Sequence, residues 1–482
     1  QPAATMTEPC DLSAVDLRAL IGARKLSPVE LVESCLKRID AVNGTVNAFV
    51  ALDEQGALAT AREQEKRLAS STEQPKLFGL PVGIKDLVNV QGIRTTYGSL
   101  LFKDHVPDAD DGQITRLRQA GAIILGKTNT PEFGSGANTT NRVYGATTNP
   151  FDPARTPGGS SGGSAAALAC SMVPLAQGSD TGGSLRAPAT WSGVVGFRPR
   201  PGAVANERRL LPLTYFSVQG PMGRSVADTA LLYSAQAGSA HPGDPMGFPF
   251  STADLAYPKP ANLSKLRVAF SEDLGSAPVD DGIKRVFRAR TGKFRAAFAH
   301  ARDDHPDIAG VRDAFWVLRC VYYMAYHKEK VEKHRDLLSP NIVTNTEAGY
   351  AMSLADVAAA EVAWRQWYDR FQAFMEDVDL LILPGNAYPP YRLDTGAPTT
   401  INGKPMENYM DASLIRSALT LTGNPVIAVP CGLDETGAPF GFQIAGKRHG
   451  EAELLSAALA IETILNADGE TARPIPDLEK LT

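Results

Sequence analysis

Hydrophobic and polar residues alternate along the first 130 residues with two different periods. Apolar side chains recur at helical spacing in residues 31–39, and more polar helical patterns cover residues 53–69 and 111–121. Short apolar runs at residues 80–84 and 122–125 follow the second and third of these helices and have the length of strands. Helices that alternate with strands in this way predict an α/β fold.

The first of these helices has clear signals at both ends. Ser27-Pro28-Val29-Glu30 forms a capping box with proline at the first helical position, and Asn43-Gly44 is typical of a helix end. We therefore expect this helix to end at Asn43-Gly44 and, with the helix at 53–69, to cover one face of a sheet.

The second half of the chain carries further strand and helix patterns. Residues 266–270 are strand-like, and residues 378–384 form the continuous apolar run of a buried parallel strand. The region 282–375 is mostly helical by its pattern, and residues 451–465 form an amphipathic terminal helix. An aromatic-rich patch in this region should mostly pack between helices, with one or two side chains lining a pocket; it comprises Phe315, Trp316, Leu318, Tyr322, Tyr323 and Tyr326.

Residues 156–186 contain two serines flanked by glycines. Ser160 lies in GGSSGG and Ser184 follows DTGG, with an Ala-rich helical segment and a short apolar strand between them. Glycine lets another backbone or a ligand approach closely. Serine becomes a nucleophile only beside a base and an oxyanion site. One such loop is typical of an ordinary turn, but two in one short span favour a catalytic site.

No histidine in the sequence can be assigned as the catalytic base. Residues 158–162 match the G-x-S-x-G nucleophile elbow, which requires an acidic residue and then a histidine downstream. None of the seven histidines lies in a recognisable catalytic context. A different candidate is Lys85, which ends the apolar run at 80–84, although a charged residue at a strand end often only faces solvent.

Three separated motifs, in this order along the chain, resemble the amidase signature family. They are Lys85 in GIKD, Ser160 in GGSSGGS and Ser184 in GSDTGGSLR. Hydrolases of that family use a Ser–cis-Ser–Lys triad. The resemblance implies that Ser184 is the nucleophile, that Ser160 is the bridging serine and that Lys85 is the base. It also implies a cis peptide bond between Gly159 and Ser160.

The same resemblance implies which residues bind the substrate. Backbone N–H groups of Thr181, Gly182, Gly183 and Ser184 would hold the oxyanion. The segment GKTNTPEF resembles a family motif whose following residues line the substrate cavity, and these are Gly134 and Ser135 in this chain.

Other polar residues of the motifs are expected to support the site. We interpret Asp86 as a structural acceptor and Lys127 as a member of a structural ion pair. Asp180 would shape the Ser184 loop through hydrogen bonds, and Arg186 would be structural. The remaining hydroxyls are expected to support the site or to cap helices: Ser161, Ser164 and Ser179. Ser179 is also expected to contact the substrate pocket.

The resemblance extends over nearly the whole chain and is densest at residues 77–224. It implies a single amidase domain over residues 1–482, with the α/β fold of the family: a mixed, twisted central sheet flanked by helices on both faces. The region at about 280–375 matches least, and we expect it to be a variable, mostly helical part that shapes the substrate site.

Composition excludes several classes of partner. The net charge of −5 and the pI of about 5.9 provide no electrostatic footprint for nucleic acid or an anionic membrane. Five scattered cysteines without a C-x-x-C pair favour neither a disulfide framework nor a zinc site, and they fit a reducing cytoplasm. No cofactor or metal motif is present in the sequence, and the oligomeric state stays open, with a homodimer as one option.

The expected activity is hydrolysis of a small-molecule carboxylic amide to an acid and an amine or ammonia, through an acyl-enzyme on Ser184. The same triad also cleaves carbamates and esters, so a urethanase or an esterase is the first alternative. The A-type component of a tRNA-dependent amidotransferase, which works in a complex, is the second. A catalytically dead binding protein is the third, and the intact Lys85, Ser160 and Ser184 argue against it.

Overall fold

The computed structural model describes residues 7–71 and 73–482. Its centre is one mixed sheet that, within these residues, has the strand order β1-β3-β2-β6-β8-β7-β14-β15-β11-β9-β10. The strands are β1 (Phe49–Leu52), β2 (Pro81–Lys85), β3 (Ile123–Thr128), β6 (Leu175–Asp180), β7 (Val195–Arg198), β8 (Val218–Gly223), β9 (Arg267–Phe270), β10 (His300–Asp303), β11 (Leu380–Pro384), β14 (Val426–Leu433) and β15 (Pro439–Ala445). Two short hairpins lie outside it: β4 (Thr140–Asn141) with β5 (Gly145–Ala146), and β12 (Thr400–Ile401) with β13 (Lys404–Pro405).

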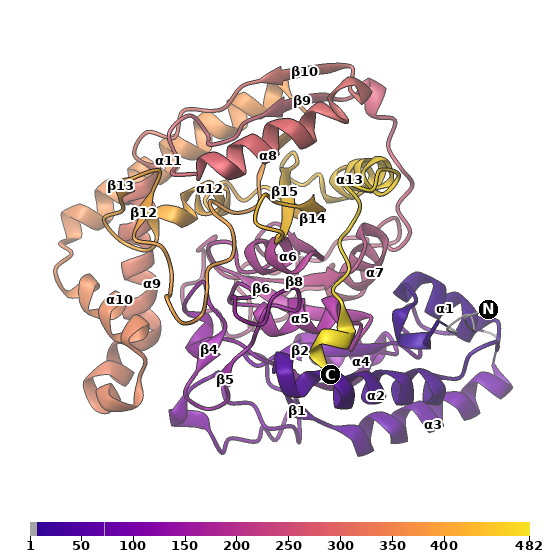
Figure 1. The fold of residues 1–482 in the computed structure, drawn as a ribbon. Coiled ribbons are helices and arrows are strands. Elements are labelled where there is room, and N and C mark those ends of the chain that lie inside the picture. Colours follow the sequence, from indigo (N-terminus) through magenta and orange to yellow (C-terminus); the bar gives the residue numbers. More distant parts are fainter. Residues whose placement is uncertain (1–6, 72) are drawn as a thin grey trace.

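Helices flank the sheet on both faces, as the α/β prediction requires. Figure 1 shows the strands stacked through the middle of the molecule, from β1 near the bottom to β10 at the top, with α9–α11 on the left and α7 and α13 on the right. The helices are α1 (Ala14–Gly22), α2 (Pro28–Val46), α3 (Glu54–Ser70), α4 (Gly112–Gln119), α5 (Gly162–Ala169), α6 (Arg186–Ser192), α7 (Val226–Gln236), α8 (Asp281–Gly292), α9 (Val311–His334), α10 (Pro340–Tyr350), α11 (Leu354–Asp377), α12 (Leu414–Thr420) and α13 (Glu451–Asn466).

The sheet unites strands from both halves of the chain. β2 and β3 come from the first third, whereas β11, β14 and β15 come from the last quarter. Large apolar clusters pack on both parts of the sheet, one built mainly from the N-terminal half and the other from the C-terminal half. This continuity supports the prediction of one domain over residues 1–482, which stays a prediction.

Strand direction positions the polar motifs. β2 pairs in parallel with β6, so that Ile84 lies opposite Gln177. The carboxyl ends of two parallel neighbours lie at the same edge of a sheet, and that edge is where α/β proteins build their sites. Lys85 at the end of β2 and Ser179 near the end of β6 are therefore neighbours, although 94 residues separate them in the chain.

Two local predictions need correction. The capping box at Ser27 and Glu30 is confirmed, but α2 continues past Asn43 to Val46. Asn43 instead stabilises the start of β1, because its side chain accepts the N–H groups of Ala48 and Phe49. The mostly helical region at 282–375 also contains β10, an exposed edge strand whose charged sequence has no apolar alternation.

The other predicted elements are present. The run at 378–384 becomes β11, buried and parallel to β9 as predicted, and also antiparallel to β15. All five cysteines are buried and free. Within residues 7–71 and 73–482, no helix is both long enough and apolar enough to cross a bilayer.

Candidate active site

Lys85 is fully buried at the carboxyl end of β2. Its Nζ lies 2.7 Å from Oγ of Ser160, 2.9 Å from Oγ of Ser161 and 2.8 Å from Oγ of Ser179. The sequence anticipated the first of these contacts. For Ser161 and Ser179 it predicted supporting or capping roles, with Ser179 also a pocket contact, and Ser179 does line the cavity described below. Both also contact the amine directly, Ser179 because β6 runs beside β2, and Ser161 because the start of α5 brings its hydroxyl next to Ser179.

The environment of Lys85 favours the uncharged amine. Burial lowers its pKa to about 7, and the nearby charge of Asp180 acts in the opposite direction. Among the described residues, no carboxylate forms an ion pair with Lys85. A neutral amine has two N–H donors and one lone pair, which matches a ring of three hydroxyl oxygens.

The loop of Ser160 meets the loop of Ser184. The peptide bond between Gly159 and Ser160 is cis, as predicted. The N–H of Ser161 donates to the carbonyl oxygen of Ser184 at 3.3 Å, which joins the two loops directly. The side chain of Ser184 is half-buried and has no hydrogen bond to Ser160 within the described residues.

Asp180 holds the Ser184 loop in shape, in agreement with the prediction. Its carboxylate accepts the N–H groups of Gly183 at 2.9 Å and Leu185 at 3.2 Å. The N–H of Gly183, one of the four predicted oxyanion donors, is thus already engaged by Asp180. Gly183 has φ of +128°, and a Cβ there would lie 2.5 Å from Nε of Arg416, so the position requires glycine.

Two buried arginines neutralise Asp180. Nε of Arg186 lies 3.0 Å and Nη1 of Arg198 lies 2.9 Å from its carboxylate. Burial by itself would raise the pKa of Asp180, but the two guanidinium groups outweigh this effect and hold the pKa below its ordinary value. Arg186 also donates to Gln443 on β15, so it ties the loop to the far strand pair and is structural, as expected.

Asp86 and Lys127 form a separate buried pair. Their side chains are 3.2 Å apart, and Nζ of Lys127 also donates to the carbonyl oxygen of Val88. Asp86 accepts the N–H and hydroxyl of Thr96. The structural roles predicted for both residues fit these contacts.

Comparison with known proteins identifies the family. A family model described as Amidase matches residues 30–455. The chain belongs to the amidase signature family. It is therefore an enzyme, an amidase that acts on amide C–N bonds.

Relatives of this amidase span its full length. An acylamidase of Rhodococcus erythropolis is 31% identical over 455 residues, which cover 94% of this chain and 95% of the relative. The A-type component of the glutamyl-tRNA(Gln) amidotransferase of Desulforudis audaxviator is 31% identical over 501 residues, covering 96% and 97%. A solved bacterial aryl acylamidase of the amidase signature family has a TM-score of 0.85 at 26% identity, over 94% of this chain and 96% of that chain. A 6-aminohexanoate cyclic dimer hydrolase has a TM-score of 0.84 at 26% identity, over 98% and 100%.

A cavity of about 480 Å³ opens onto the serines of this amidase. Ser160, Ser179, Thr181 and Gly134 line it. Gly134 has φ of +72°, and a Cβ there would lie 3.3 Å from Oγ of Ser160, so only glycine leaves that hydroxyl uncrowded. Ser135 is buried and bonds the hydroxyl of Tyr323 instead of lining the cavity. Gly182, Gly183 and Ser184 are also absent from its described lining.

The amidase cavity has an aromatic wall, to which the aromatic-rich patch contributes more residues than the sequence predicted. Three of the six residues in the aromatic-rich patch line the cavity, whereas one or two were expected: Tyr322, Tyr323 and Tyr326. A helix with apolar residues on several faces does not reveal which face meets a cavity. Sequence reasoning also missed Arg319, His327 and Lys330 on the same helix, whose spacing of i, i+8 and i+11 was the one available signal. The other rings of the wall are Tyr97, Phe102 and Phe133.

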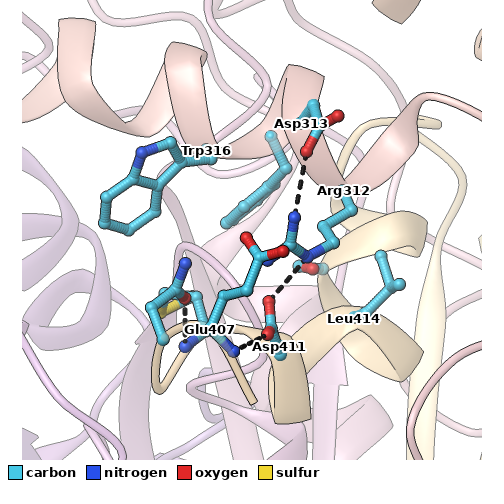
Figure 2. Close-up of a pocket in the computed structure, with 10 residues that line it drawn as sticks. Arg312, Asp313, Trp316, Glu407, Asp411 and Leu414 are labelled. Carbon is cyan, nitrogen blue, oxygen red and sulfur yellow. Dashed lines mark hydrogen bonds and ion pairs between the residues drawn. The ribbon is translucent and has the colours of Figure 1, made fainter. Parts of the chain in front are cut away.

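A second, smaller depression of about 140 Å³ lies between α9 and the segment that leads into α12. Figure 2 shows Arg312 directed toward Asp313, Glu407 and Asp411, which its guanidinium contacts at 3.1, 2.7 and 2.7 Å. These four charges are paired with one another, so none of the charged residues that line the depression is without an ion-pair partner.

Within residues 7–71 and 73–482, no group of three or more His, Cys, Asp and Glu side chains has an arrangement that could hold a metal ion.

Proposed function

We propose that this amidase hydrolyses a small-molecule carboxylic amide through an acyl-enzyme on Ser184, with Ser160 and Lys85 as a proton relay. The observation that carries the proposal is the buried amine of Lys85, 2.7 Å from Oγ of Ser160 and with a pKa lowered to about 7. A base with a pKa near the working pH is suited to proton transfer.

The hydrogen bonds around Lys85 support the direction of that relay. The hydroxyl of Ser161 donates its proton to the carbonyl oxygen of Ser179, so toward Lys85 its oxygen can only accept. A neutral amine can donate to Ser161 and Ser179, and its lone pair then accepts the proton of Ser160. Ser161 and Ser179 thereby orient the base.

The proposed chemistry proceeds in two acyl-transfer steps. Ser160 accepts the proton of Ser184 while it passes its own to Lys85, and Oγ of Ser184 attacks the carbonyl carbon. Ser160 then returns a proton to the leaving nitrogen, and the C–N bond breaks. Water, deprotonated by the same relay, attacks the acyl-enzyme and releases the acid and free Ser184.

Backbone donors of the Ser184 loop would bind the oxyanion. The N–H groups of Thr181, Gly182 and Ser184 are the donors we propose, with Gly183 held by Asp180. Removing one oxyanion donor typically lowers the rate by about 10²–10³. Gly134 would bound the site on the side of Ser160, and Ser135 would act through Tyr323.

Hydrolysis of carbamates or esters remains an alternative use of the same residues. The A-type component of an amidotransferase is a further candidate, because relatives with that name match the chain at 31% identity. Such a component would release ammonia from glutamine and require a partner protein. The acylamidase relative and the aryl acylamidase structure favour a small-molecule substrate.

The test is hydrolysis of an aliphatic amide, an anilide, an aryl ester, an aryl carbamate and glutamine by the wild type and by Ser184→Ala. We expect turnover of the amide or the anilide that the variant loses by about 10⁴-fold or more. Mass spectrometry after a sulfonyl fluoride should show the label on Ser184. A preference for carbamate or ester would change the substrate class, and equal activity of the variant would overturn the mechanism.

A further inference from the structure

Helix α9 places a buried guanidinium in the wall of the main cavity. Arg319 is 6% exposed and lines the cavity together with Ser160 and Thr181. Arginine stays protonated in proteins. A buried charge is stable only when it is paired or well hydrogen-bonded, so its partners indicate what it can still bind.

The partners of Arg319 are all neutral. Its Nη2 donates to the hydroxyls of Tyr323 and Tyr409, at 2.8 Å each, and its Nε donates to Oδ1 of Asn345 at 3.2 Å. No aspartate or glutamate in residues 7–71 and 73–482 forms an ion pair with it. The buried guanidinium groups around Asp180 differ in this respect, because they share a carboxylate.

One nitrogen of Arg319 remains for a bound molecule. Nε and Nη2 are directed at protein acceptors, whereas Nη1 has no acceptor among the described residues. Because the side chain borders the cavity, Nη1 is the donor that a molecule inside it can reach. The three neutral contacts also hold the planar group, and with it Nη1, in one orientation, so Nη1 offers its N–H groups to an anion without reorganising.

Arg319 is connected to Ser160, the proposed bridging serine, through a short series of contacts. The hydroxyl of Tyr323 bonds both Arg319 and Ser135. Ser135 follows Gly134, at which an added Cβ would lie 3.3 Å from Oγ of Ser160. Because Arg319 and Ser160 line the same cavity of about 480 Å³, one small molecule inside it can touch both.

The acidic residues of the cavity do not compete for Arg319. The carboxylate of Asp111 accepts from Nε of Arg208 at 2.8 Å. That of Glu207 accepts the N–H of Gly112 at 2.6 Å. Both acids are thus engaged by other groups.

The neighbours of Arg319 on α9 add no negative charge. Lys330 donates to the carbonyl oxygen of Tyr326 and lies over the ring of Phe133, 5.3 Å from its centroid. Burial, reinforced by Lys330 and Arg319, lowers the pKa of His327 to about 3, so the imidazole is neutral at neutral pH. The cavity is therefore cationic and aromatic on this side.

We propose that Arg319 binds a carboxylate of the substrate, so that this amidase acts on small amides that carry an anionic group on an aromatic or apolar body. The proposal rests on the proposed function, because it assigns the substrate class of that same site. Arg319 is then a specificity-determining residue, and the aromatic wall contacts the remainder of the substrate.

The experiment compares anilides in pairs that differ only in a carboxylate against a carboxamide. Succinanilic acid and its amide place the group on the acyl side, and 4-acetamidobenzoate and 4-acetamidobenzamide place it on the leaving side. In one pair at least, wild-type kcat/KM should favour the carboxylate by tenfold or more. Arg319→Met should reduce that ratio to near one, mainly through KM, and Arg319→Lys should retain part of it.

Arg312→Met is the matched control, because Arg312 lies on the same helix but at the second depression (Figure 2). The control should retain the wild-type ratio. Equal rates within both pairs in the wild type would overturn the proposal, as would an Arg319→Met variant that keeps the ratio.

A binding measurement covers two further cases: an Arg319 variant that does not fold, and an enzyme that turns over none of the four anilides. Calorimetry on the folded Ser184→Ala protein should then show that benzoate binds at least tenfold more tightly than benzamide. Equal binding, or none, would overturn the anion site. Absent turnover of every amide, ester and carbamate would by contrast reject the proposed function alone.

Discussion

The reactive core and the wall formed by α9 differ in how their buried polar groups are satisfied. In the core, Lys85 contacts three hydroxyls, and Asp180 is neutralised by two guanidinium groups. In the wall, Nδ1 of His327 has no hydrogen-bond partner among the described residues, and Arg319 has no carboxylate partner among them. Both regions are buried, but Lys85 and Asp180 find their partners within the protein, whereas His327 and Arg319 keep hydrogen-bonding capacity that a ligand could use.

This difference separates chemistry from recognition. A fully satisfied network holds its members in one geometry, and catalysis by positioned groups requires that. A buried group with unused hydrogen-bonding capacity is stabilised when a ligand supplies the partner. We infer that core substitutions should change kcat or folding, whereas wall substitutions should change which substrate is preferred.

The largest loss of activity is expected from a substitution of Lys85 in the reactive core, and a small loss there would break the comparison. Lys85→Met removes the base while keeping an apolar side chain of similar length, so kcat should fall by about 10²–10⁴-fold. Steady-state kinetics measure the loss, and the melting temperature and circular dichroism confirm that the variant is folded. A folded variant with more than a tenth of wild-type kcat would contradict the role of Lys85.

Asp180→Asn tests whether the core is held by its charges. The change leaves Arg186 and Arg198 buried without a counter-ion, which should lower the free energy of unfolding by about 3–5 kcal/mol. Denaturant midpoints measure it. Asp369→Asn, which removes an exposed ion pair with Arg365, is the matched control and should cost below about 1 kcal/mol. A similar loss of unfolding free energy in the two variants would show that the charge of Asp180 does not hold the core together.

The pH profile sharpens the assignment of the base. Lys85 must be neutral to accept a proton, and its pKa is lowered to about 7. With an uncharged substrate, kcat/KM should be level above that pH and should fall as the pH drops below it and the amine becomes protonated. The loss should approach about tenfold per pH unit. A profile that stays level down to about pH 5, two units below that pKa, with the enzyme still folded, would argue against a lysine base.

The smallest effect is expected at the outer part of the wall. The hydroxyl of Tyr326 accepts the N–H of Leu210 at 3.0 Å, at an exposed position. Tyr326→Phe keeps the ring and should change KM by less than about fourfold, because an exposed hydrogen bond contributes little net free energy. A larger change in kcat than in KM would mean that the wall takes part in chemistry and that the two regions are not separate.

Several local features were readable from the residues. The capping box at Ser27, the buried run at 378–384 and the hydrogen bonds of Asp180 to its own loop depend on near neighbours or strong local patterns, and the structure has them. The structural roles of Asp86 and Lys127 also fit, although their ion pair joins distant parts of the chain. The end of α2 was placed too early because Asn43-Gly44 is a helix-end signal that the following strand overrides. β10 was missed because an exposed edge strand needs no apolar alternation.

The sequence by itself determined the fold class and the motifs of Lys85, Ser160 and Ser184, because glycine-flanked serines and a lysine after an apolar strand are local features. Only the tertiary structure decided that Ser161 and Ser179 complete the ring around Lys85, since that depends on β6 lying parallel beside β2 and on the start of α5 packing its serine against Ser179. It alone decided that Arg319 faces the cavity. A helix with apolar and aromatic side chains on several faces can pack in more than one rotation, and its neighbours select one.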